Sequence, residues 1–98
     1  MRILALEREL PGATAADFHL YAKAEAAWAW ELYQSGVIRE MYFRADRNEA
    51  VLVLECADTE QAHAELQTLP FVQHGLIAFD VIPLKPYPGF ARLFAKED

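Results

Sequence analysis

Apolar residues recur along this chain in stretches that predict four β-strands. The first stretch covers residues 2–9 and ends at Leu10-Pro11-Gly12, a turn signal that a strand interior does not tolerate. Residues 37–46 and 50–56 carry strand patterns on either side of a polar turn, which predicts an antiparallel hairpin. A fourth strand is expected over residues 76–84, where a proline-rich stretch then ends regular structure.

Two further segments follow the period of an α-helix and carry start and stop signals. Thr14 with Asp17 three positions later is close to a capping box, and Ser35-Gly36 supplies a C-terminal stop. These signals predict a helix over residues 14–35. Asp58 with Gln61 predicts the start of a second helix, which is expected to run until Pro70.

The order of these elements is βαββαβ, the arrangement of ferredoxin-like α+β domains. We expect one domain over residues 1–98, in which a four-stranded antiparallel sheet carries two helices on one face. The third strand, however, is apolar on both faces, as in Val51-Leu52-Val53-Leu54, and the fourth is similar. Two helices cover only one side of a sheet, so the other side needs a partner. The pattern predicts a homodimer that packs sheet against sheet.

Composition and charge narrow the classes of function. A chain that is 54% apolar with a net charge of −6 is typical of a soluble folded protein and is a poor match for nucleic acid. No apolar run approaches the roughly 20 residues of a membrane helix, and the N-terminal segment lacks a signal-peptide pattern. The lone Cys56 lies in an apolar run and is expected to be a buried thiol. We expect a cytoplasmic protein that binds neither nucleic acid nor membrane.

Glu25 is the strongest functional pointer, because it stands where an apolar side chain is expected. A helix turns by about 100° per residue, so one stripe of the first helix has Glu25 in its middle. The apolar members of this stripe are Phe18, Tyr21, Ala22, Trp28, Ala29 and Leu32. An ionised carboxylate facing a core costs several kcal/mol unless it is paired or meets water. It could pair with an arginine on the sheet, reach solvent on a rotated helix, be a hydrogen-bonded structural group, or line a ligand pocket.

Two sets of residues resemble families of the dimeric α+β barrel superfamily. The Leu69-Pro70-Phe71 turn, with the Glu25 helix that ends at Gly36, resembles muconolactone isomerase, a small enzyme of aromatic-acid breakdown. The stretch Pro70-Phe71-Val72 with Gly75, followed by Leu84-Lys85-Pro86-Tyr87, is similar to the end of YCII-related proteins. The resemblance covers most of the chain. It implies the ferredoxin-like fold in a dimeric barrel, without a metal or cofactor.

The resemblance also implies a role for Glu25. Counted back from Gly36, this residue falls on the glutamate of the first helix that acts in proton transfer in muconolactone isomerase. In YCII-like proteins the same position holds a histidine with a suspected functional role. The isomerase has a lysine about one turn earlier, whereas Ala22 stands there in this chain and Lys23 points about a quarter-turn away. Because of this difference, the resemblance does not by itself specify which reaction this chain catalyses.

Moving a proton between carbons of an unsaturated lactone requires a base that becomes the acid, and an electrophile that stabilises the enolate. Glu25 is the candidate base. We expect Phe18, Tyr21 and Trp28 to line a dry pocket around it, in which the pKa of the carboxyl rises toward neutrality.

The second strand supplies candidates for binding the substrate carboxylate. A guanidinium binds a carboxylate as a fork, so Arg39 and Arg44 are both considered, and strand parity lets only one of them face the helices. Arg39 is preferred because it shares a face with Met41 and Phe43. The alternative for either arginine is a salt bridge at the rim.

Two further residues are candidate ligand contacts. Tyr42 could hydrogen-bond a ligand carbonyl or simply pack in the sheet. His74, in the loop before Gly75, is expected beside the pocket mouth as a ligand or proton-relay residue.

The leading hypothesis is a small-metabolite isomerase or related acid–base enzyme that acts on a lactone or carboxylated substrate. The alternative is a non-catalytic dimeric module of the YCII-like type, with a ligand-binding or structural role. Metal binding is not expected, because no H-x-x-x-H or C-x-x-C spacing occurs. Trp30 lies off the apolar stripe, and the tail around Phe90 and Phe94 is aromatic. Exposed aromatic side chains favour a second contact between subunits, so the sequence is also compatible with assemblies larger than a dimer.

Overall fold

A computed structural model describes residues 1–96 of the chain, and its elements follow the predicted order. The α+β fold with a βαββαβ core is confirmed, with one short helix added before the last strand and a 3₁₀ helix after it. The elements are β1 (Arg2–Glu9), α1 (Ala15–Gln34), β2 (Ile38–Phe43), β3 (Ala50–Glu55), α2 (Thr59–Leu66), α3 (Pro70–Gln73), β4 (Ile77–Pro83) and η1 (Pro88–Leu93).

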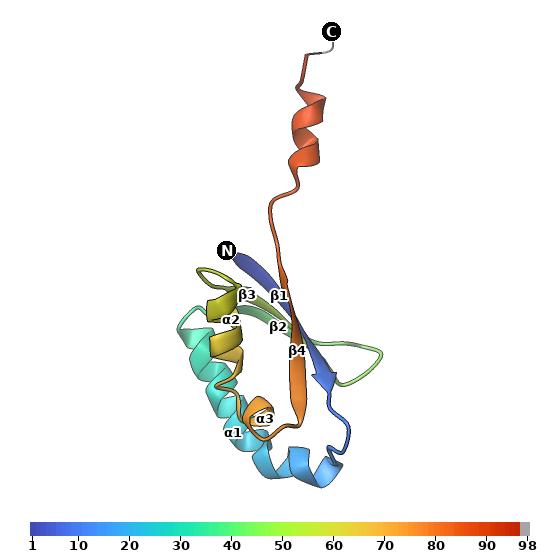
Figure 1. Ribbon diagram of the computed structural model, residues 1–98, viewed down its shortest axis with the longest axis vertical. Coiled ribbons are helices and arrows are strands. Elements are labelled where there is room, and N and C mark those ends of the chain that lie inside the picture. Colours follow the sequence, from blue (N-terminus) through green and yellow to red (C-terminus); the bar gives the residue numbers. More distant parts are fainter. Residues whose placement is uncertain (97–98) are drawn as a thin grey trace.

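The four strands form one antiparallel sheet in the order β2-β3-β1-β4. All the α-helices lie on the same side of this sheet, as Figure 1 shows. Alternate residues of each strand therefore enter the core, for example Ile3 and Ala5 on β1 and Leu54 on β3. They pack against Leu32 of α1 and Leu66 of α2. Burial of these side chains fixes the helix layer on the sheet.

Both ends of α1 follow their sequence signals. The Thr14 hydroxyl accepts a hydrogen bond from the Asp17 N–H at 3.2 Å, and the Asp17 carboxylate accepts one from the Thr14 N–H at 3.1 Å. This reciprocal pair is the predicted capping box. At the other end the chain turns at Gly36, whose φ of 85° lies in the left-handed region that favours glycine. These two signals set the length and position of α1.

The second helix is shorter than predicted, and Pro70, where the sequence suggested its end, begins a new helix. α2 stops at Leu66, and the four-residue α3 starts with Pro70 in its first turn. Proline is well suited to that position, since its fixed φ is helical and it has no N–H to leave unpaired. The next residue, Phe71, does have an N–H that no backbone carbonyl of the helix can accept.

The face of the sheet opposite the helices is apolar in its middle, as the sequence pattern predicted. Leu4 on β1 lies between Val53 on β3 and Ile82 on β4 in the strand register, and Leu6 lies beside Val51. Neighbours across antiparallel strands project on the same side. These five side chains form what we call the open-face patch.

Beyond β4 the chain leaves the domain as a C-terminal arm, residues 84–96, which contains η1 (Figure 1). The arm makes the molecule long, with extents of 64 × 29 × 20 Å. Within the arm, Tyr87 packs edge-on against Phe90, with 4.9 Å between the ring centroids. Phe90 and Phe94 stay largely exposed. No helix in residues 1–96 is long and apolar enough to cross a membrane.

Replacement of a core leucine away from any cavity should show how much the sheet–helix packing contributes. Leu54 is 1% exposed, so Leu54→Ala should lower the free energy of unfolding by about 2–5 kcal/mol. Leu20 on α1 is 69% exposed, and Leu20→Ala should change it by less than about 0.5 kcal/mol. Urea denaturation followed by circular dichroism measures both. Similar losses in the two variants would contradict this assignment of the core.

Candidate active site

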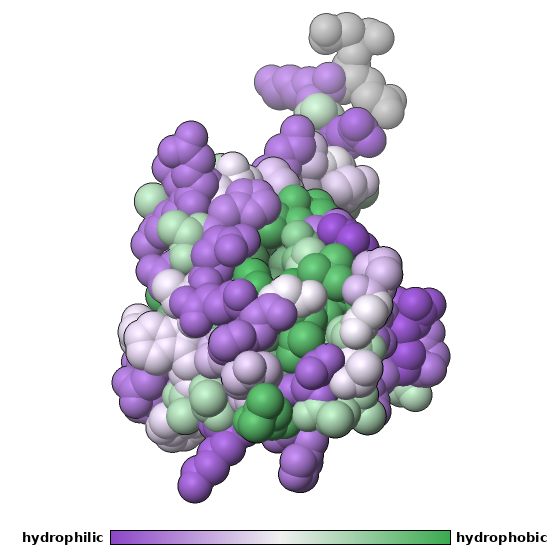
Figure 2. All heavy atoms as spheres, turned by 60° about the horizontal axis from the view of Figure 1, so that its bottom comes forward, coloured by the Kyte–Doolittle hydropathy of each residue, from purple (hydrophilic) through white to green (hydrophobic). Residues whose placement is uncertain are grey.

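A small cavity lies between α1 and the sheet, and two glutamates project into it. Its volume is about 50 Å³, which is room for a few water molecules and less than the volume of a substrate. The glutamates are Glu7 of β1 and Glu25 of α1. The other lining residues are apolar, namely Ala29, Ile38, Met41, Phe43, Ala50, Leu52, Leu69, Phe71 and Phe79. Figure 2 shows the surface from the lower end of Figure 1, with apolar side chains in the middle and hydrophilic ones around them.

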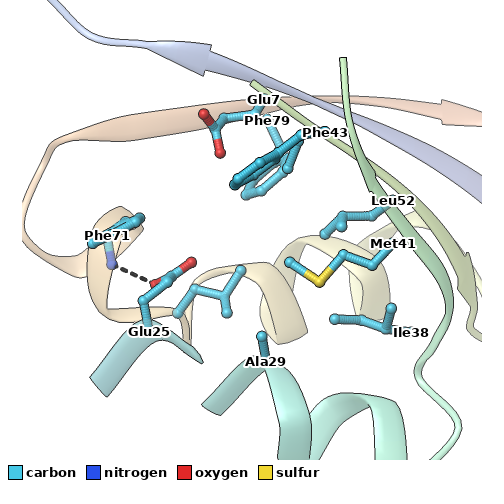
Figure 3. A pocket seen from close by; sticks show the side chains of 11 residues that line it. Glu7, Glu25, Ala29, Ile38, Met41, Phe43, Leu52, Phe71 and Phe79 are labelled. Atoms are coloured by element: carbon cyan, nitrogen blue, oxygen red, sulfur yellow. Dashed lines mark hydrogen bonds between the residues drawn. The ribbon is translucent and has the colours of Figure 1, made fainter. Parts of the chain in front are cut away.

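Glu25 is held by a single backbone hydrogen bond. Its Oε1 accepts from the N–H of Phe71 at 2.9 Å, so the carboxylate satisfies the free donor at the start of α3 (Figure 3). The side chain is half-buried. Burial raises the pKa of the Glu25 carboxyl above its ordinary value, and the Phe71 hydrogen bond acts in the opposite direction. The predicted stripe is present only in part. Phe18, Tyr21, Ala29 and Leu32 are half-buried or buried, whereas Ala22 and Trp28 are exposed.

Glu7 was not singled out by the sequence analysis, yet its carboxyl is the more strongly perturbed of the two. Burial raises its pKa from 4.5 to about 7. The nearby backbone of Ala50 lowers the pKa, while the negative charges of Glu49, Glu25 and Glu9 raise it further. Glu25 is the other carboxylate that lines the cavity, and its negative charge is one of the smaller causes of the raised pKa of Glu7. The pocket therefore holds two carboxyl groups, one from the helix layer and one from the sheet.

A signal for Glu7 does exist in the sequence. Ile3, Ala5 and Glu7 alternate along β1, and the first two are fully buried against the helices. Strand parity places the third on the same face, where its register partner on β4 is Phe79. A charged residue at a core-facing position of β1 is the counterpart of Glu25 on α1.

Three aromatic residues predicted to line the pocket instead hold α1 against the rest of the domain. Phe18 packs edge-on against Phe71, with 5.2 Å between the ring centroids, and so supports the residue that binds Glu25. The Trp28 indole N–H donates to the hydroxyl of Thr68, in the segment that links α2 to α3. Tyr21 stacks on His74 with 3.7 Å between the centroids. None of the three is among the lining residues of the Glu7–Glu25 cavity.

His74 and Tyr21 belong to a different hollow on the surface. That hollow is also lined by Gly12, by Asp17 and by Gly75, at the N-terminal end of α1. His74 directly follows α3, whose Phe71 lines the Glu7–Glu25 cavity. Its ring stacks on Tyr21, and His74 is not among the residues that line that cavity.

The expectation that Arg39 shares a face with Met41 and Phe43 is wrong, because β2 contains a bulge. Ile38 pairs with Leu54 and Met41 with Leu52, and both residues face the helices. In a regular strand, two residues on the same face are an even number of positions apart, but these two are an odd number apart. The register shifts between Ile38 and Glu40, and Arg39 is the extra residue. Its guanidinium lies 3.9 Å from the position that a Cβ on Gly36 would take, at the end of α1.

The other polar candidates of β2 also lie away from the cavity. Tyr42 pairs with Val51, on the open face of the sheet, and its hydroxyl donates to the Glu40 carboxylate at 2.8 Å. Arg44 makes a salt bridge with Asp46, with an N···O distance of 2.6 Å, which is the rim pairing that the sequence left open. Among the described residues that line the cavity there is no lysine, arginine or histidine.

This arrangement suits proton exchange with an uncharged group. Burial raises the pKa of both carboxyl groups, so each holds a proton at a higher pH than an exposed glutamate does and is better suited to exchange it with a ligand. A ligand carboxylate placed between them would meet repulsion from both. Within residues 1–96, no group of three or more His, Cys, Asp or Glu side chains could hold a metal ion.

Comparison with known proteins identifies a family for this chain and agrees with the observed fold. The family described as muconolactone delta-isomerase matches residues 5–89. Among solved structures, a similar fold occurs in 5-chloro-2-hydroxyhydroquinone dehydrochlorinase (TftG) from Burkholderia phenoliruptrix AC1100, in its complex with 2,5-dihydroxybenzoquinone. The TM-score is 0.67 at 20% identity, and the alignment covers 87% of this chain and 94% of that chain. No curated protein matches the chain significantly.

Burial of Glu7 should make the protein less stable as the pH rises. The pKa is about 7 in the folded protein against 4.5 ordinarily, so folding favours the protonated form. The contribution is complete below about pH 4.5 and is lost as the pH rises through about 7. We expect a loss on the order of 1–2 kcal/mol, less than the full pKa shift would give, because the carboxyl is only half-buried.

Urea unfolding at a series of pH values between 5 and 8 measures this loss. Glu7→Gln should flatten the pH dependence, since an amide does not titrate in this range. Glu60→Gln, at an exposed position of α2, should keep the wild-type slope. Equal slopes in wild type and Glu7→Gln would mean that Glu7 is not held in its protonated form by the fold.

Proposed function

This chain belongs to the muconolactone delta-isomerase family, and we propose that it moves a proton between carbons of a small unsaturated lactone, with Glu25 as the base. The observation that carries the proposal is the position of Glu25. Its carboxylate faces an apolar cavity and is fixed by one backbone N–H, which leaves the second oxygen free. A carboxylate in such surroundings is basic enough to take a proton from a carbon that is conjugated with a carbonyl group through a double bond.

The lactone ring, and not a charged group, is the part of the substrate that fits between Glu7 and Glu25. The cavity walls are apolar apart from these two residues, so they favour an uncharged ring. A carboxylate on the substrate would have to point out of the cavity. We propose that the cavity opens further when a ring enters, because its present volume of about 50 Å³ is too small for one.

A role in the breakdown of aromatic compounds is consistent with the family. The name of the family refers to a lactone, and the similar structure of TftG belongs to an enzyme that acts on a substituted hydroquinone. The family match supports the first of the two resemblances found in the sequence.

A structural role for Glu25 has one specific observation in its favour, namely the hydrogen bond to Phe71. Glutamine offers the same acceptor atom but cannot act as a base. A Glu25→Gln variant therefore separates the two roles, since it keeps the contact with α3 and removes the chemistry.

We further propose that two copies of the chain pack together through the open-face patch. Leu4, Leu6 and Val53 are only half-buried in the single chain, and Ile82 is 41% exposed. Paired charges flank the patch, such as Arg8 with Asp80 at 2.9 Å. An apolar centre with a polar rim is the usual composition of a dimer interface. A cytoplasmic location remains a prediction from the sequence.

Glu25→Gln should lower the kcat for isomerisation of muconolactone at least about 100-fold, because it removes the general base. The reaction is followed by NMR, and Glu31→Gln, at an exposed position of the same helix, is the matched control. Circular dichroism should show that both variants fold. Wild-type turnover in Glu25→Gln would overturn the role given to Glu25.

Leu4→Glu should prevent dimer formation, because it places a charge at the centre of the open-face patch. Size-exclusion chromatography with light scattering gives the mass. Leu20→Glu, on the exposed side of α1, should leave the mass unchanged. An unchanged mass for Leu4→Glu would show that this face is not the interface.

A further inference from the structure

The two carboxyl groups of the cavity come from opposite layers of the fold. Glu25 projects from α1 in the helix layer, and Glu7 projects from β1 in the sheet, with both directed into the same space (Figure 3). The remaining lining residues supply no other acid or base. A flat ring that enters between the layers would have one carboxyl group on each of its faces.

The surroundings of the two carboxyl groups differ, and the difference indicates which of them is more readily ionised. Glu25 has a fixed N–H donor in Phe71, which stabilises a negative charge on it. Glu7 also has a backbone group beside it, that of Ala50, but three carboxylates act against a negative charge on it, those of Glu49, Glu25 and Glu9. Glu49 is itself paired with Arg47 at 3.4 Å and lies 3.8 Å from Arg44, so these cations are directed to Glu49 and not to Glu7.

The geometry points to Glu7 as a second catalytic residue, a carboxylic acid that donates a proton to the substrate from the sheet side while Glu25 removes one from the helix side. The inference rests on the proposed isomerisation and gives it two proton-transfer groups.

The proposed steps are balanced. The C–H bond at the γ-carbon, beyond the double bond that is conjugated with the lactone carbonyl, breaks, its proton moves to Glu25, and the electron pair spreads through the double bond onto the carbonyl oxygen as a dienolate. The O–H bond of Glu7 then breaks, and its proton forms the new C–H bond at the carbon next to the carbonyl. Glu25 now carries a proton and Glu7 a negative charge. Exchange with water returns both groups to their starting forms, so no oxidant or reductant is needed.

The origin of the hydrogen in the new C–H bond depends on which residue donates it. With Glu7 as donor, the new hydrogen comes from a group that exchanges with solvent between turnovers. With Glu25 acting alone, the same carboxyl would carry the hydrogen from one carbon to the other, and part of it would return to the product.

Carbon-13 NMR of protein labelled at the glutamate carboxyl carbons tests the coupling without any substrate. Signals are assigned with Glu7→Gln and Glu25→Gln. In the wild type, Glu7 should titrate near pH 7, and in Glu25→Gln its titration should move to lower pH because a neighbouring negative charge is gone. Titration of Glu7 at the same pH in both proteins would overturn the pair.

Isomerisation of muconolactone in D₂O tests the catalytic role. The wild type should place one deuterium at the new C–H position in each turnover, and its kcat should fall as the pH rises through about 7. Glu7→Gln should lower kcat at least about 100-fold and remove that fall. Glu60→Gln, exposed on α2, is the control for the effect of losing a charge elsewhere. Glu7→Asp, which keeps an acid, should restore part of the rate.

The outcomes separate this inference from the proposed function. If Glu7→Gln keeps the wild-type rate while Glu25→Gln is inactive, Glu25 acts alone and the role of Glu7 is overturned. If Glu25→Gln is active, or if the wild type does not isomerise muconolactone, the proposed function itself fails and the role of Glu7 in it fails as well. A decrease in Glu7→Gln that Glu7→Asp partly restores, with both variants folded, supports the pair.

Discussion

Two carboxyl groups between α1 and the sheet are only partly hydrated, and the packing around them has to accommodate this. Glu7 and Glu25 face an apolar space, and the described lining residues provide no cation to neutralise them. Two negative charges in such a space would repel each other strongly, so the pair holds a proton more tightly than exposed glutamates do. The backbone N–H of Phe71 decides which group is the stronger acid.

The neighbouring residues hold Glu25 and its hydrogen-bond donor in place. Pro70 begins α3 and leaves the N–H of Phe71 pointing outward, while Phe18 packs against the Phe71 ring. Trp28 connects α1 to Thr68, just before α3. The aromatic side chains on α1 therefore fix the distance between α1 and α3 and keep Glu25 within reach of its donor. Their contribution to the site is one of position.

The sequence predicted the fold and one of the two carboxyl groups, because those features depend on short-range patterns. The capping box at Thr14, the glycine after α1 and part of the apolar stripe around Glu25 are local signals that are present in the structure. Glu7 was overlooked since a glutamate near the end of a strand is ordinary until the buried face of the strand is known. The bulge at Arg39 and the helix at Pro70 depend on tertiary packing, which local patterns do not specify.

The sequence distances within the cavity also bear on when it can form. Glu25 and Phe71 are 46 positions apart, and Glu7 pairs with Phe79 on the last strand. Closing such long loops costs entropy that is recovered only when the distant segments dock. During synthesis, β1 and α1 leave the ribosome well before α3 and β4 are available to complete the walls. The two acidic groups therefore remain hydrated in the nascent chain and acquire their unusual chemistry at the last stage of folding.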